Sequence, residues 1–146
     1  MPQVIVASDA HWVRDQVKAS LCSPGFEVVE VARGQDVRRV VGEIEPDLVV
    51  VDLQIANMGG MAVSIDLRLE ESAGRLPHVP VLLLLDREAD KFLARSAQAD
   101  AILVKPFDPG TLRRVVKNLI AAEEARRAAE EAEEDAGAEP VEAETA

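Results

Sequence analysis

Two carboxylates and one ammonium group stand at the ends of short apolar segments. Asp9 follows QVIVAS at residues 3–8, Asp52 lies near the end of DLVVVDL at residues 47–53, and Lys105 ends ILVK at residues 102–105. A buried charge is costly unless it is paired or binds a metal, so such a carboxylate is a candidate functional group. Two neighbouring acids favour a hard cation such as Mg²⁺, and a lysine beside them favours an anion.

Each of these residues also has an ordinary structural explanation. An acid after a strand is commonly the N-cap of the next helix, and Asp9 could fill that role. A lysine at the end of a strand is usually just solvated, as Lys105 could be. The functional interpretation therefore depends on all three residues meeting at one edge of the fold.

Apolar runs alternate with helical patterns over the first 120 residues. Strands are predicted at residues 3–8, 26–32, 47–53, 79–85 and 101–104. Helices are predicted between them, as with Val13, Val17 and Leu21 at intervals of four. Another helix is predicted at 61–72 with an apolar stripe at positions 61, 65 and 69, and a last one with Asp108 as N-cap and Pro109 as its first residue.

Five strands that alternate with five helices predict an α/β fold with a parallel sheet covered on both faces. Right-handed crossovers favour a doubly wound sheet. Such sheets bind ligands at the carboxyl ends of their strands. Asp9, Asp52 and Lys105 all stand at such ends, so we expect them on one rim.

Composition narrows the class of protein. The formal net charge is −11, with ten acids and two arginines in residues 121–146. The remaining residues form no dense basic face, which argues against binding of nucleic acid. No apolar run reaches the roughly 18–20 residues that span a bilayer, so no membrane partner is expected. A single cysteine, Cys22, agrees with a cytoplasmic location.

The chain is predicted to divide into a domain at 1–120 and an acidic tail rich in Ala and Glu at 121–146. The last helix should extend into the tail to near Asp135, and disorder should follow past Gly137 and Pro140. Glu123 and Arg127 can pair at i, i+4. The tail is expected to be a solubilising segment, with binding of a partner as the alternative. His78 is predicted to be an ordinary loop residue.

Together these motifs resemble the receiver domain of two-component response regulators over about residues 3–120. DLQIANMGG at 52–60 is similar to the phosphoacceptor loop of the family, D-x-x-M-P-x-M-x-G. ILVKPFDPGTL at 102–112 resembles the family's last strand, its lysine, its cis Lys-Pro peptide and its last helix. The resemblance implies a flavodoxin-like sheet of strand order 2-1-3-4-5.

The resemblance also implies roles for individual residues. Asp52 would accept a phosphoryl group and Lys105 would contact it. Asp9, Asp52 and the backbone carbonyl of Gln54 would bind Mg²⁺, and Ser8 could hold a metal-bound water. The donor would be a histidine kinase or a phosphotransfer protein. The chain would be no enzyme beyond promoting its own phosphoryl transfer and hydrolysis.

The output implied for a single-domain member is a contact with a downstream protein whose identity the sequence does not give. In the family, the surface of the fourth helix, fifth strand and fifth helix commonly makes such contacts. A homodimer is left open.

Several positions depart from the pattern of the family. Ser8 precedes Asp9 where two adjacent acids are usual, so Mg²⁺ should bind more weakly. Leu85 stands at the usual Thr or Ser position, and Ile102 at the usual aromatic position, so the familiar hydroxyl–aromatic switch is missing. Asp86 adds an acid near the rim. Two interpretations follow: a phosphorylated receiver with an unusual output, or a phosphorylation-independent pseudo-receiver that acts as a protein-binding adaptor.

Overall fold

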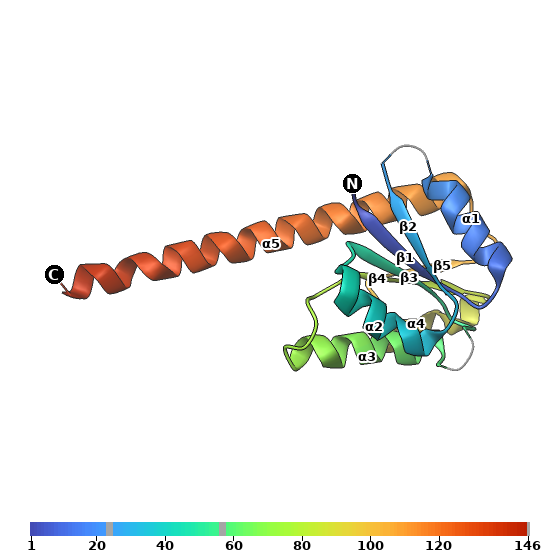
Figure 1. Cartoon of the computed structure of the whole chain (residues 1–146), viewed down its shortest axis with the longest axis horizontal. Coiled ribbons are helices and arrows are strands. Elements are labelled where there is room, and N and C mark those ends of the chain that lie inside the picture. The colour runs from blue at the N-terminus through green and yellow to red at the C-terminus, as the bar shows by residue number, and fades with distance from the viewer. Residues whose placement is uncertain (23–24, 56–57, 146) are drawn as a thin grey trace.

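Five parallel strands form one sheet in the order β2-β1-β3-β4-β5, as the sequence predicted (Figure 1). The computed structural model describes residues 1–22, 25–55 and 58–145, with side chains up to residue 136. The turn residues 23–24 and the loop residues 56–57 lie outside the described part. The strands are β1 (Gln3–Ala7), β2 (Glu27–Val31), β3 (Leu48–Asp52), β4 (Val81–Leu85) and β5 (Ala101–Val104).

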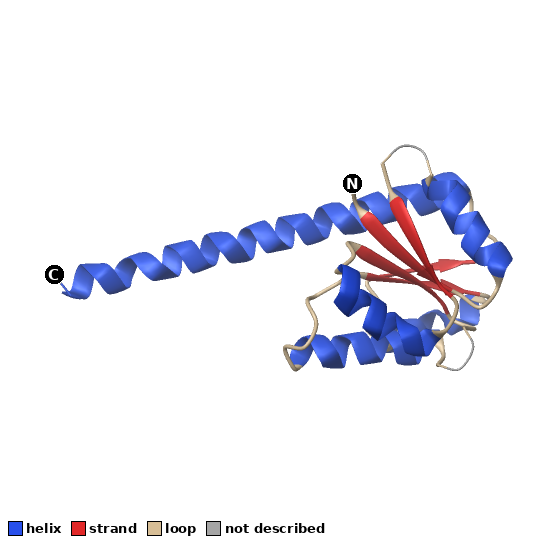
Figure 2. Ribbon diagram, in the orientation of Figure 1, coloured by secondary structure: helices blue, strands red, loops and turns tan. Residues whose placement is uncertain are grey.

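Helices cover both faces of this sheet, as Figure 2 shows. The helices α1 (His11–Leu21) and α5 (Pro109–Thr145) lie on one face. On the other face lie α2 (Gly34–Ile44), α3 (Gly60–Ser72) and α4 (Lys91–Ser96), the last preceded by a short 3-10 turn, η1 (Glu88–Asp90). In the part of the chain that the structure describes, no helix is both long and apolar enough to cross a membrane.

Alternate residues of the central strands build two separate cores. Ile5 of β1 packs on the side of α2 and α3, and its neighbour Val6 packs on the side of α1 and α5. All five residues of β4 are buried, as its unbroken apolar run predicted. Fully burying one Val or Leu side chain stabilises the fold by about 1.5–3 kcal/mol, so the two cores hold the strand ends in a fixed register.

The apolar stripe predicted for α3 is wrong at two of its three positions, because Met61 packs against the core but Ile65 and Leu69 do not. Ile65 and Leu69 are 42% and 61% exposed, whereas Val63 and Leu67 are buried. Both pairs satisfy helical spacing, so periodicity alone does not choose between them. The start of the helix decides the rotation, because a Cβ on Gly60 would come within 2.6 Å of a carbonyl oxygen of β3. Only glycine allows this close approach, and it turns Val63 and Leu67 toward the sheet.

α5 extends well beyond the body of the domain (Figure 1). Its start is as predicted: Oδ2 of Asp108 accepts hydrogen bonds from the backbone N–H groups of Gly110 at 3.0 Å and Thr111 at 3.3 Å. The helical backbone continues to Thr145 and so differs from the predicted end near Asp135 and the predicted disorder past Gly137. Ala and Glu, which favour helix, make up most of this segment.

Glu123 anchors α5 where the helix leaves the sheet. Its buried carboxylate accepts hydrogen bonds from Arg126 at 2.8 Å and from Arg127 at 3.0 Å, which confirms the i, i+4 pair. His78 lies in a loop, as predicted, but its imidazole lies between Glu123 and Glu71, a contact that the sequence did not indicate. Burial raises the pKa of Glu123, but the hydrogen bonds from Arg126 and Arg127 and the charges of His78 and Arg126 outweigh it and hold that pKa below its ordinary value.

Candidate functional site

The carboxyl ends of β1 and β3 and the residue after β5 bring Ser8, Asp52 and Lys105 into contact. Ala7 is paired with Val51 across the two strands, so the next residue of each strand, Ser8 and Asp52, lie side by side. Nζ of Lys105 reaches across β4 to within 2.8 Å of Oδ1 of Asp52. The sequence predicted that the lysine and Asp52 lie on one rim, and the structure brings the two side chains into contact.

Both oxygens of the Asp52 carboxylate are engaged. Oδ2 accepts a hydrogen bond from Oγ of Ser8 at 2.9 Å, and Oδ1 accepts one from the backbone N–H of Gln54 at 3.2 Å in addition to the contact with Lys105. Asp52 is only 3% exposed. One cation and two neutral donors thus surround the charge of this buried carboxylate.

Asp9 lies beside this cluster with an exposed side chain. It does not cap the following helix, because Ala10 holds the N-cap position of α1. Oγ of Ser8 accepts a hydrogen bond from the Ala10 backbone N–H at 3.1 Å and so orders the turn that carries Asp9. Within residues 1–22, 25–55 and 58–136, no hydrogen bond or ion pair joins the Asp9 side chain to the other site residues.

Asp86 shares the lysine with Asp52. Its Oδ1 lies 3.3 Å from Nζ of Lys105, so the extra acid at this rim points toward the ammonium. The backbone N–H of Lys105 also donates to the carbonyl of Leu85 at 2.7 Å, which fixes the start of the loop after β5 against the end of β4. The positive charge of Lys105 is therefore divided between two carboxylates.

Leu85 and Ile102 both belong to the core on the α2–α3 side of the sheet. Leu85 is completely buried, and Ile102 is partly buried against the same cluster. Apolar packing thus fills the two positions at which the resemblance would place a hydroxyl and an aromatic ring. Neither side chain can donate a hydrogen bond to an anion at the rim.

Ile55 and Gly60, on either side of residues 56–57, are hydrogen-bonded to the end of β3 and the residue after it. The backbone N–H of Ile55 donates to the Asp52 carbonyl at 3.2 Å, and the N–H of Gly60 donates to the Leu53 carbonyl at 3.1 Å. These bonds, together with the lack of a side chain at Gly60, keep the Gln54 backbone next to the Asp52 carboxylate.

The donor groups at this rim suit Mg²⁺. The carboxylates of Asp9 and Asp52 and the backbone carbonyl of Gln54 offer oxygen only, which a hard cation prefers. Among the described residues, no three His, Cys, Asp or Glu side chains gather as a metal site by themselves. A cation here would therefore also need a main-chain oxygen and water molecules as ligands. This suits Mg²⁺, which usually keeps several water ligands when it binds to proteins.

Comparison with known proteins identifies relatives of this arrangement. A family model for the response regulator receiver domain matches residues 4–117. The chain is 25% identical over 119 residues to the aerobic respiration control protein ArcA of Escherichia coli (strain K12). This match covers 82% of this chain and 48% of ArcA. The chain thus spans about half the length of the curated relatives it matches.

Solved structures share the fold. A putative response regulator from Chloroflexus aurantiacus superposes with a TM-score of 0.75 at 25% identity, over 83% of this chain and 99% of that one. The receiver domain of the sensor histidine kinase PA1611 from Pseudomonas aeruginosa, whose structure has a magnesium ion coordinated in the active site cleft, gives a TM-score of 0.72 at 23% identity, over 82% of this chain and 98% of that one.

Proposed function

The chain belongs to the response regulator receiver domain family, and we propose that it accepts a phosphoryl group on Asp52 from a histidine kinase or phosphotransfer protein. The observation that carries the proposal is the 2.8 Å contact between Nζ of Lys105 and Oδ1 of Asp52. Positive charge fixed beside a carboxylate compensates the charge that arrives with a phosphoryl group.

The chemistry is a transfer between two nucleophiles. An oxygen of Asp52 attacks the phosphorus of a phosphohistidine, and the P–N bond breaks as the P–O bond forms. The Gln54 backbone N–H and the Lys105 ammonium hold the carboxylate in one orientation during the attack. Water later hydrolyses the acyl phosphate and restores Asp52. Receiver domains are phosphoacceptors of this kind and do not turn over a separate substrate.

Asp9, Asp52 and the backbone carbonyl of Gln54 would hold Mg²⁺, and the Ser8 hydroxyl would orient a water bound to it. The cation supplies further neutralisation of the charge on the incoming phosphoryl group. Ser8 contributes no negative charge, so weaker binding of Mg²⁺ is expected than with two adjacent acids.

The output is proposed to start at Lys105. Phosphorylation adds about −1.5 to −2 charges at the rim, which draws the ammonium toward the phosphoryl oxygens and away from Asp86. The loop after β4 then loses the contact that Asp86 makes with Lys105. A downstream protein would recognise the rearranged loop. We also propose that the protein acts in the cytoplasm and does not bind nucleic acid directly.

A second function, a phosphorylation-independent adaptor, is favoured by the apolar pair Leu85 and Ile102. These side chains fill the switch positions with core packing, so the surface near them would keep one shape whatever the state of Asp52. In that case the chain would bind its partner constitutively.

Mass measurement after incubation with Mg²⁺ and acetyl phosphate tests the first function. One phosphoryl group should appear on the wild type and be absent from Asp52→Asn. Asp15→Asn, which removes an exposed carboxylate from α1, is the matched control and should still be modified. If neither acetyl phosphate nor a phosphorylated phosphotransfer protein modifies the wild type, phosphoryl transfer is excluded and the adaptor is supported.

A further inference from the structure

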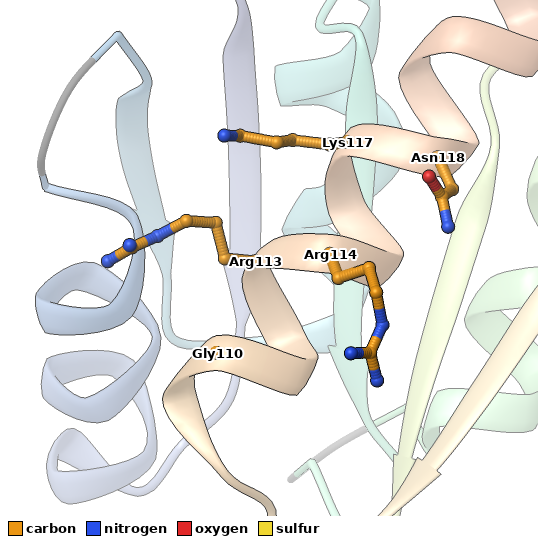
Figure 3. A pocket seen from close by; sticks show the side chains of 5 residues that line it. All are labelled: Gly110, Arg113, Arg114, Lys117 and Asn118. Atoms are coloured by element: carbon orange, nitrogen blue, oxygen red, sulfur yellow. The ribbon is translucent and has the colours of Figure 1, made fainter.

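An open basic hollow of about 250 Å³ lies on the surface of α5 near its start, as Figure 3 shows. It is lined by Gly110, Arg113, Arg114, Lys117 and Asn118. Nε of Arg113 donates to the Ser20 carbonyl at 3.0 Å, but across the side chains that the structure describes no carboxylate pairs with any of the three cations. Three uncompensated positive charges around one hollow attract an anionic partner.

The same side of α5 turns acidic beyond the body of the domain. Because an α-helix advances about 100° per residue, the line through Arg113 and Lys117 continues through Glu124, Glu131 and Asp135. These three acids are exposed, and no ion pair joins them to any cation of the described side chains. Alanines at positions 121, 125, 128 and 132 occupy the adjacent line, so a second helix can approach closely.

We infer that two copies of the chain pair through antiparallel α5 helices, with the acidic segment 124–135 of each copy seated on the basic hollow of the other. Lys117 of one copy then lies beside Glu131 of the other, and Arg113 lies beside Asp135 in the same register. Because the dimer has two-fold symmetry, each of these contacts occurs twice. The 14 residues between Lys117 and Glu131 span roughly 21 Å, which places the acids clear of the body of their own domain.

A second copy fits better than an unrelated basic partner. A basic protein would cover the acidic segment but leave the hollow open, whereas a second copy satisfies both surfaces at once. The extension of α5 projects from the domain with nothing packed on it (Figure 1). Because solvated helices gain most of their stability from packing, pairing would stabilise this segment. The inference does not rest on phosphorylation of Asp52.

The same pairing of the two α5 helices creates one unfavourable contact. Glu124 lies midway between Lys117 and Glu131, so the two copies of Glu124 face each other near the two-fold axis. Like charges at this distance oppose pairing. Glu124→Gln should therefore lower the dissociation constant of the dimer. A dimer formed through a different surface would not respond in this way.

Sedimentation equilibrium of the unphosphorylated full chain tests the pairing. The wild type should dimerise, and the dimer should weaken as salt rises from about 0.05 to about 0.5 M. Lys117→Glu and Glu131→Lys should each raise the dissociation constant roughly tenfold or more, since attraction becomes repulsion at two equivalent contacts. Glu133→Lys makes the same charge change on the opposite side of α5 and should leave the dimer intact.

Mixing the two charge-reversal variants gives the sharpest result. Each variant alone should be largely monomeric, but the mixture should form a heterodimer, because both contacts then join opposite charges. A wild type that stays monomeric overturns the inference. So does a dimer that Lys117→Glu leaves unchanged, or a mixture of the two variants that fails to associate although both are folded by circular dichroism.

Discussion

The hydroxyl of Ser8 donates a hydrogen bond to Oδ2 of Asp52 over 2.9 Å at the edge where β1 and β3 end. A second carboxylate at this position would repel Asp52, whereas the hydroxyl stabilises it. The carboxylate is thus held by three donors, of which one, the Lys105 ammonium, is charged. Three predictions concern this rim, and a fourth concerns the ion pairs that Glu70 of α3 makes with Arg38 and Arg75.

Ser8→Asp should raise the affinity for Mg²⁺ by on the order of tenfold, because a second negative oxygen ligand joins the site. Titration calorimetry measures the affinity. Without metal the variant should melt at a lower temperature than wild type, since two buried carboxylates repel each other. Ser96→Asp, an added acid on exposed α4 surface, should change neither property. An unchanged affinity would show that position 8 lies outside the cation site.

Asp86→Asn should speed phosphorylation by acetyl phosphate a few-fold. The change removes one of two acids that share Lys105 and one negative charge near the incoming anion. Exposed ion pairs are worth about 0.2–1 kcal/mol, which limits the gain. Rates are followed by mass spectrometry, with Glu43→Gln, which removes an exposed acid near the end of α2, as the control. A rate equal to or below that of wild type would contradict the competition between the two acids.

Leu85→Thr should lower the free energy of unfolding by roughly 1.5–3 kcal/mol, because a fully buried apolar side chain becomes smaller and polar. Leu83→Thr, two residues earlier on the same face of β4, should cost a similar amount in urea denaturation. Only at position 85 is the hydroxyl expected to reach the phosphoryl group. Acetyl phosphate should therefore restore stability to Leu85→Thr alone, and equal recovery of both variants would refute this.

Glu70 should make stability depend on pH below the neutral range. Hydrogen bonds from Arg75, at 2.7 and 3.0 Å, and from Arg38, at 3.0 Å, hold the pKa of Glu70 below its ordinary value of 4.5 against the effect of burial. A carboxyl whose pKa is lower in the folded state than in the unfolded state stabilises the fold above the unfolded value. That contribution is lost as the pH falls through about 4.5 and below.

Glu70→Gln should consequently be less stable than wild type at pH 7, and the difference should shrink as the pH is lowered past this value. Urea denaturation at a series of pH values measures it. Glu133→Gln, on the exposed part of α5, is the matched control and should follow wild type throughout. A difference between Glu70→Gln and wild type that stays constant with pH would exclude the ionised pair as its cause.

The sequence determined the elements and most of the site. Apolar spacing located five strands and the helices between them, and the unbroken run of β4 predicted its burial on both faces. Because parallel strands present their carboxyl ends on one edge, the positions of Asp52 and Lys105 sufficed to place them on one rim, where the structure shows them in contact. These features depend on local propensity and on a topology with few alternatives.

Only the tertiary structure decided the directions of individual side chains. Spacing could not tell which stripe of α3 faces the sheet, and Ile65 and Leu69 turned out to face solvent. Nor could it show that Asp86 turns toward Lys105, or that His78 contacts Glu123, which is far from it in the sequence. Such choices depend on packing between elements distant in the chain, where the close approach of one glycine or one ion pair selects a single orientation.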